Sequence, residues 1–102
     1  GVSFVDMEDI LLVQREERAT VMYAEGNRRF VLPGTLSEAE ERLDPALFFR
    51  CHKSFLVNLT YAQEIDPEFH IFTMSDGTNV HIRREELSAA KKALQDFRSQ
   101  DH

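Results

Sequence analysis

The sequence predicts a mainly β domain with one short inserted helix and one C-terminal helix. Short apolar runs of strand length recur along the chain, each bounded by glycine, proline or charged residues. The hydrophobic spacing changes to a helical period only twice, after Gly34 and after Arg84. The 102 residues match one ordinary domain, without internal repeats or low-complexity tracts. The hairpin spacing alone permits any small barrel or roll.

The first part of the chain predicts three strands. Residues 10–14 form an apolar run, and residues 15–18 are all charged, which is typical of a turn or exposed loop. Strands are expected at residues 20–24 and 28–32, joined as a hairpin through a turn that contains Gly26.

A short helix follows this hairpin. Thr35 and Glu38 have the spacing of a capping box, in which each side chain satisfies an amide of the first turn. Leu43 continues the apolar face that begins at Leu36, and Pro45 prevents further extension. We expect two to three turns that cover one end of the sheet.

The second part predicts further short strands and the C-terminal helix. The strands are expected at residues 49–52, 55–57, 62–65, 69–74 and 79–82. Asp76 and Gly77 supply the left-handed positions of a hairpin turn between the last two. The C-terminal helix has one apolar face, formed by Leu87, Ala90, Leu94 and Phe97.

The charge balance argues against nucleic acid at first sight. Acidic residues outnumber Lys and Arg by 18 to 12, whereas phosphate neutralisation usually requires a basic protein. The basic residues nevertheless recur in short groups, at residues 15–18, 28–29, 50–53 and 83–84. A domain with separated faces can bind DNA through its basic face, with weak affinity for random DNA.

The sequence offers no catalytic or metal centre. His52 and Ser54 lie close together, but no carboxylate in the run around them is available to orient the imidazole. Cys51 and His52 are adjacent and point to opposite faces of a strand, and His70 with His81 gives only two ligands. We therefore expect no enzyme activity, no metal and no cofactor.

The only cysteine excludes an intrachain disulfide and fits a reducing compartment, with Cys51 as a packing residue. No apolar run approaches the roughly 18 residues of a membrane span, and no secretory signal is visible. Because the chain begins at Gly1 rather than Met, we expect a single domain, residues 1–102, excised from a longer chain.

Residues 48–59 lie in the longest run without an acidic residue. Considered by its composition alone, this stretch is a core strand in which a few polar side chains reach solvent. Its pattern closely resembles the central motif of LytTR-type DNA-binding domains, which carry Phe-x-Arg-x-His-x-Ser-x-x-Val-Asn. The matching residues here are Phe48, Arg50, His52, Ser54, Val57 and Asn58. The resemblance extends over roughly residues 5–97.

The resemblance implies an elongated, barrel-like arrangement of short antiparallel sheets. It also implies sequence-specific binding of promoter DNA through loops in the major groove. Such domains act as effector domains of bacterial two-component response regulators, in a phosphorelay. We therefore expect double-stranded promoter DNA and an N-terminal receiver domain as partners, a cytoplasmic location, no membrane, and a dimer on DNA repeats as one mode of binding. The alternative is a small β-barrel protein-interaction module that uses its acidic surface.

Three loops supply the expected DNA contacts by position in the family. These residues are Arg15 and Arg18 in the first loop, Arg50, His52, Lys53 and Ser54 around the second, and Arg83 and Arg84 in the third. The family commonly has Pro-Val-Ser-Arg where this chain has His-Ile-Arg-Arg, so Arg83 replaces a serine. Asn58 is expected to be structural, because its amide can satisfy backbone groups of the neighbouring turn.

Overall fold

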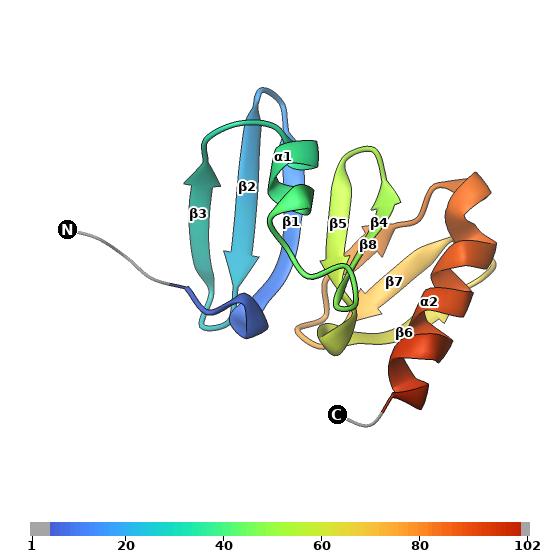
Figure 1. Ribbon diagram of the computed structural model, residues 1–102. Coiled ribbons are helices and arrows are strands. Elements are labelled where there is room, and N and C mark those ends of the chain that lie inside the picture. Colours follow the sequence, from blue (N-terminus) through green and yellow to red (C-terminus); the bar gives the residue numbers. More distant parts are fainter. Residues whose placement is uncertain (1–4, 101–102) are drawn as a thin grey trace.

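Two antiparallel sheets form the body of the protein in the computed structural model, which describes residues 5–100 (Figure 1). The larger sheet has the order β3-β2-β1-β5-β4, and the smaller has the order β6-β7-β8. The described part of the chain measures 42 × 32 × 25 Å along its principal axes. The predicted mainly β fold with two helices is confirmed, and neither sheet closes into a barrel within residues 5–100.

The larger sheet is built around β1 (Ile10–Glu16), which pairs with β2 (Ala19–Ala24) on one side and β5 (Phe55–Asn58) on the other. The outer strands are β3 (Arg28–Leu32) and β4 (Phe48–His52). The first four residues of β1 are all buried, because one core lies on each face of the sheet. A strand covered on both faces accounts for the continuous apolar run at the start of β1.

The inserted helix α1 (Leu36–Glu41) has the predicted capping box between Thr35 and Glu38. It lies across one face of the larger sheet, in front of β1 in Figure 1, and buries Leu36 against that face. Its six residues make fewer than two turns, shorter than expected. The last turn tightens, because the Arg42 and Leu43 amides donate three residues back, to the Ala39 and Glu40 carbonyls, each at 3.1 Å. The Asp44 carboxylate then accepts from the Ala46 amide at 2.9 Å and forms the turn that follows the helix.

The smaller sheet contains β6 (Ala62–Asp66), β7 (Ile71–Met74) and β8 (Asn79–His81). Helix α2 (Leu87–Ser99) packs its buried Ala90 and Leu94 into the core that the two sheets share. Strand β7 begins two residues later than predicted. The Asp66 carboxylate accepts from the amides of Glu68 and Phe69, and His70 adopts a left-handed φ of 55°. The turn therefore extends through His70.

Asn58 is fully buried at the end of β5 and joins two parts of the chain. Its amide nitrogen donates to the Ile10 carbonyl at 2.8 Å, and its side-chain oxygen accepts from the Thr60 amide at 3.0 Å. The predicted structural position of Asn58 is confirmed. In the described part of the chain, no helix is both long and apolar enough to cross a membrane.

Candidate nucleic-acid interface

Three connections meet at one end of the fold. The β4–β5 turn lies in the centre, and the Ser54 carbonyl accepts from the Arg15 amide of β1 at 2.9 Å. On the other side, the Arg83 amide after β8 donates to the Cys51 carbonyl of β4 at 2.7 Å. The β1–β2 turn, the β4–β5 turn and the β8–α2 connection therefore lie in a row, towards the top of Figure 1. We call this row the basic end. Its residues are Arg15, Arg18, His52, Lys53, Ser54, His81, Arg83 and Arg84.

The first connection is tighter than predicted. Residues 15–18 were expected as a loop, but β1 continues to Glu16, which pairs with Ala19 of β2. Only Glu17 and Arg18 remain in the turn, and Glu17 has a left-handed φ of 54°. Arg15 therefore projects from a hydrogen-bonded strand, whereas Arg18 projects from the turn. Both side chains are exposed.

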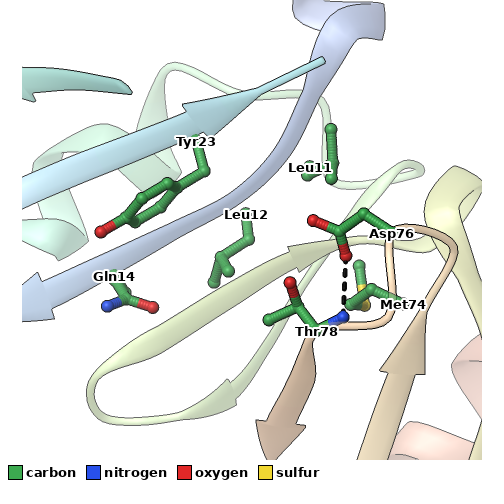
Figure 2. A pocket seen from close by; sticks show the side chains of 7 residues that line it. All are labelled: Leu11, Leu12, Gln14, Tyr23, Met74, Asp76 and Thr78. Atoms are coloured by element: carbon green, nitrogen blue, oxygen red, sulfur yellow. Dashed lines mark hydrogen bonds between the residues drawn. The ribbon is translucent and has the colours of Figure 1, made fainter. Parts of the chain in front are cut away.

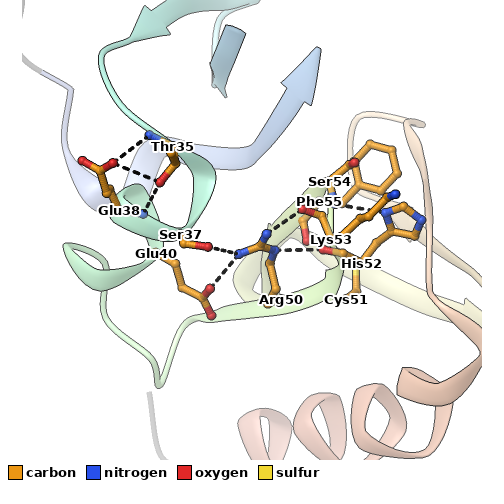
Figure 3. Close-up of polar contacts among 10 residues, drawn as sticks. All are labelled: Thr35, Ser37, Glu38, Glu40, Arg50, Cys51, His52, Lys53, Ser54 and Phe55. Carbon is orange, nitrogen blue, oxygen red and sulfur yellow. Dashed lines mark hydrogen bonds and ion pairs between the residues drawn. The ribbon is translucent and has the colours of Figure 1, made fainter. Parts of the chain in front are cut away.

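Arg50 lies behind the central turn and binds it from within the protein (Figure 3). Its Nε donates to the His52 carbonyl at 2.9 Å, and its Nη2 donates to the Lys53 carbonyl at 2.5 Å. Nη1 donates to the Glu40 carboxylate of α1 at 2.9 Å and to the Ser37 hydroxyl at 3.4 Å. Four of the five guanidinium N–H bonds thus have partners, and the side chain is only 25% exposed.

His52 is held at the surface of the same turn. Its Nδ1 accepts a hydrogen bond from the Ser54 amide at 3.0 Å, which leaves the Nε2–H as the outward donor. Its ring lies 5.3 Å from the His81 ring and 5.1 Å from the Phe55 ring. Partial burial lowers the pKa of His52, and the nearby His81 and Lys53 lower this pKa further. The imidazole is therefore mainly neutral at pH 7.

His81 was absent from the predicted contacts, although it lies between the second and third connections. Its neighbours Val80 and Ile82 are buried, so alternation along β8 directs His81 outwards. Two features of the sequence could have identified His81 as a contact residue. They are the alternation along β8 and the position of His81 just before the third connection.

Two adjacent arginines of the third connection differ in their freedom. The Arg83 Nε forms an ion pair with the Glu85 carboxylate at 2.9 Å, and both side chains are well exposed. Arg84 begins the short 3-10 turn Arg84–Glu86 that leads into α2, and its guanidinium has no hydrogen bond or ion pair to residues 5–100. The backbone is fixed at Arg84 while its side chain is available to a ligand.

The unpaired cations are concentrated at the basic end. All twelve Lys and Arg residues lie in the described range, and the side chains of six have no hydrogen bond or ion pair there. Four of these six belong to the basic end: Arg15, Arg18, Lys53 and Arg84. The other two are Arg42 and Lys91. Charge available for a polyanion is thus gathered on one end of a chain whose net charge is −6.

Other chemistry is poorly supported at this end. Ser54 meets His52 through its backbone amide, so the contact is not that of a nucleophile with its base. Within residues 5–100, no group of three or more His, Cys, Asp and Glu side chains could hold a metal ion. Cys51 is completely buried, and burial raises the pKa of its thiol to about 12, which is the behaviour of a packing residue.

A pocket of about 250 Å³ lies where the two sheets meet (Figure 2). Its lining residues are Leu11, Leu12, Gln14, Tyr23, Met74, Asp76 and Thr78. The only charged group among them is the Asp76 carboxylate, which accepts from the Thr78 amide at 2.9 Å. An apolar pocket with a carboxylate does not suit a phosphate group, whereas the basic end carries unpaired positive charge.

The fold and the site together define a class of protein. It is a small, open β domain that presents unpaired cations at one end, on and beside neighbouring connections. The family model described as the LytTr DNA-binding domain matches residues 1–95. The chain belongs to this family of DNA-binding domains, which occur in transcription regulators.

Relatives and a solved structure agree with this assignment. The sensory transduction protein LytT of Enterococcus faecalis is 32% identical over 96 residues, which cover 91% of this chain and 39% of LytT. The transcriptional regulatory protein YpdB of Escherichia coli K12 is 38% identical over 64 residues, which cover 63% of this chain and 26% of YpdB. A solved LytTr DNA-binding domain from Bacillus cereus superimposes with a TM-score of 0.81 at 27% identity, covering 88% of this chain and 84% of that one. The chain therefore spans less than half the length of these curated relatives.

Proposed function

We propose that the basic end binds promoter DNA in a sequence-specific manner, as the effector domain of a bacterial two-component response regulator. The observation that carries the proposal is the arrangement of the unpaired cations. Three of the six lie in or directly after three connections that form one row, and the fourth, Arg15, lies at the end of β1 beside the first of them. Backbone hydrogen bonds join the first connection to the second and the second to the third, so the charges are presented at set positions.

The groups of the basic end suit different parts of DNA. The planar fork of Arg84 fits the O6 and N7 of guanine in the major groove, since its guanidinium is unpaired within residues 5–100. Lys53 is a flexible point charge that suits a base edge or a phosphate. Arg15 and Arg18 suit phosphates beside the first turn, and Ser54 adds a hydroxyl at the centre.

Arg83 and His52 are assigned weaker contacts. Arg83 already forms an ion pair with Glu85, so a DNA phosphate must either displace the Glu85 carboxylate or bind beside it. Neutral His52 can donate only through Nε2, because its Nδ1 is occupied by the Ser54 amide. Both residues therefore adjust the affinity rather than dominate it.

The proposal extends to the longer protein. The matched region makes up 39% of LytT and 26% of YpdB, so both relatives are longer than this domain. We propose that the longer protein also carries an N-terminal receiver domain. Gly1, on which the expectation of an excised domain rests, lies outside the described residues. A dimer on repeated sites, a cytoplasmic location and the absence of a catalytic step belong to the same proposal.

Selection from a random duplex pool tests the function, because it requires no choice of promoter at the outset. The enriched duplex and a scrambled duplex of equal composition are then titrated by fluorescence anisotropy at several salt concentrations. We expect enrichment of one sequence, and a log–log salt slope near −0.9 per phosphate contacted. Failure to enrich any sequence would contradict the proposal, and so would binding that does not change with salt.

A further inference from the structure

Arg50 connects the inserted helix to the central turn of the basic end. One side of its guanidinium meets the His52 and Lys53 carbonyls, and the other meets Glu40 and Ser37 of α1 (Figure 3). Figure 3 shows the Arg50 side chain lying between α1 and the turn, while the Lys53 side chain projects away from it.

We propose that Arg50 is a positioning residue for DNA recognition, oriented by Glu40, and that it does not itself contact DNA. The inference rests on the proposed function of the basic end. Arg50 was among the residues expected to touch DNA, but its geometry directs four of its five N–H bonds into the protein.

The guanidinium fixes the backbone on which the contact residues sit. The β4–β5 pairing shifts register between Arg50 and His52, so regular sheet hydrogen bonding is interrupted just before the turn. Arg50 replaces it by binding two successive carbonyls with one planar fork. The Ser54 amide and carbonyl are bonded to His52 and Arg15. The turn is thus held on both sides, and Lys53 retains freedom only in its side chain.

Glu40 in turn sets the orientation of Arg50. Its carboxylate lies 2.9 Å from Nη1, on the opposite side of the guanidinium from the turn. The helix that carries Glu40 is fixed at its start by the capping box of Thr35 and Glu38. The Glu40 carboxylate does not itself contact DNA in this proposal. It supports the DNA-binding turn by orienting Arg50.

Glu40→Gln distinguishes positioning from simple charge. Removal of a negative charge should strengthen binding to DNA if only long-range electrostatics matter. If Glu40 orients Arg50, the same substitution should weaken binding of the selected duplex, by about three- to tenfold. Glu41→Gln is the matched control, because Glu41 is exposed on the same helix and its carboxylate has no hydrogen bond or ion pair within residues 5–100. We expect the control to bind at least as tightly as the wild type.

Arg50→Lys and a double-variant cycle complete the test. Lysine keeps the charge but cannot bind two carbonyls and a carboxylate as one fork, so Arg50→Lys should weaken binding of the selected duplex without changing the salt slope. Its effect should largely disappear when Lys53 is already alanine, because both changes act through the same contact. Amide exchange at Ser54 should also become faster in Arg50→Lys.

The outcomes separate this inference from the proposed function. If wild type selects no duplex, the proposed function fails. If wild type selects a duplex but Glu40→Gln binds it more tightly, only the positioning role fails. An Arg50→Lys effect that adds fully to that of Lys53→Ala would identify Arg50 as an independent contact. Urea unfolding of each variant verifies that the variant is folded. If Arg50→Lys does not fold, Glu40→Gln on the surface helix α1 still tests the positioning role.

Discussion

Replacement of Asn58 by alanine should destabilise the domain by about 1.5–4 kcal/mol. The estimate follows from its two hydrogen bonds. The Ile10 carbonyl belongs to a residue that is 5% exposed, so it loses its amide partner where water has little access. That loss costs about 1–3 kcal/mol. Thr60 is exposed, so its amide can bind water and its lost hydrogen bond adds only about 0.5–1 kcal/mol.

Urea unfolding measures this loss directly, with Asn79→Ala as the control. Asn79 is exposed at the start of β8, so its replacement should change the stability by less than about 0.5 kcal/mol. For a domain of this size, 1 kcal/mol corresponds to about 4–8 °C in Tm, so a loss of about 1.5–4 kcal/mol should lower Tm by about 6–32 °C. An unchanged Tm with DNA binding abolished would refute the structural role and make Asn58 a contact residue.

Three further predictions concern the basic end and the thiol behind it. Arg84→Ala should relax preference at one base position, a loss of about 1–3 kcal/mol of discrimination, whereas Lys53→Ala should weaken selected and random duplexes evenly. Equal loss on all duplexes for Arg84→Ala would identify a phosphate clamp. Because the folded pKa of His52 is lowered, the unfolded chain binds its proton more readily, so stability should fall as the pH decreases below about 6.5. His52→Gln should reduce this pH dependence in urea titrations at pH 8 and 5.5, and an identical dependence would refute the assignment. Cys51, with a pKa raised to about 12, should react with thiol reagents only on unfolding, and rapid labelling of the folded domain at pH 8 would contradict its burial.

Local patterns in the sequence were sufficient for most elements of the fold. The capping box at Thr35 and the turn at Gly77 depend on residues within four positions of each other, so their sequence determines them. The turn differs from the prediction in one respect: only Gly77 is left-handed, with a φ of 90°, whereas Asp76 is not left-handed and accepts a hydrogen bond from the Thr78 amide. The C-terminal helix follows from its regular apolar face, of which Ala90 and Leu94 are buried. Element boundaries were less predictable. The extension of β1 to Glu16 depends on its pairing with β2 rather than on its own charged residues.

The candidate site was predictable as a set of residues but not as an arrangement. The family motif identified Lys53 and Ser54, yet their proximity to Arg15 arises from pairing between β1 and β5, which lie far apart in the sequence. The orientation of Arg50 depends on Glu40, which the short helix α1 brings to it. No local pattern distinguishes a cation that faces solvent from one that binds backbone carbonyls.

Matched substitutions inside and outside the basic end distinguish a localised DNA-binding surface from a general effect of positive charge. Lys53→Ala is compared with Lys91→Ala, and Arg84→Ala with Arg42→Ala, because all four side chains are exposed and unpaired within residues 5–100. The measurement is the affinity for the selected duplex at two salt concentrations. We expect weaker binding for Lys53→Ala and Arg84→Ala, with a slope reduced by about 0.9 for each phosphate that is no longer bound. We expect little change for Lys91→Ala and Arg42→Ala, and equal losses in all four variants would contradict DNA binding at the basic end.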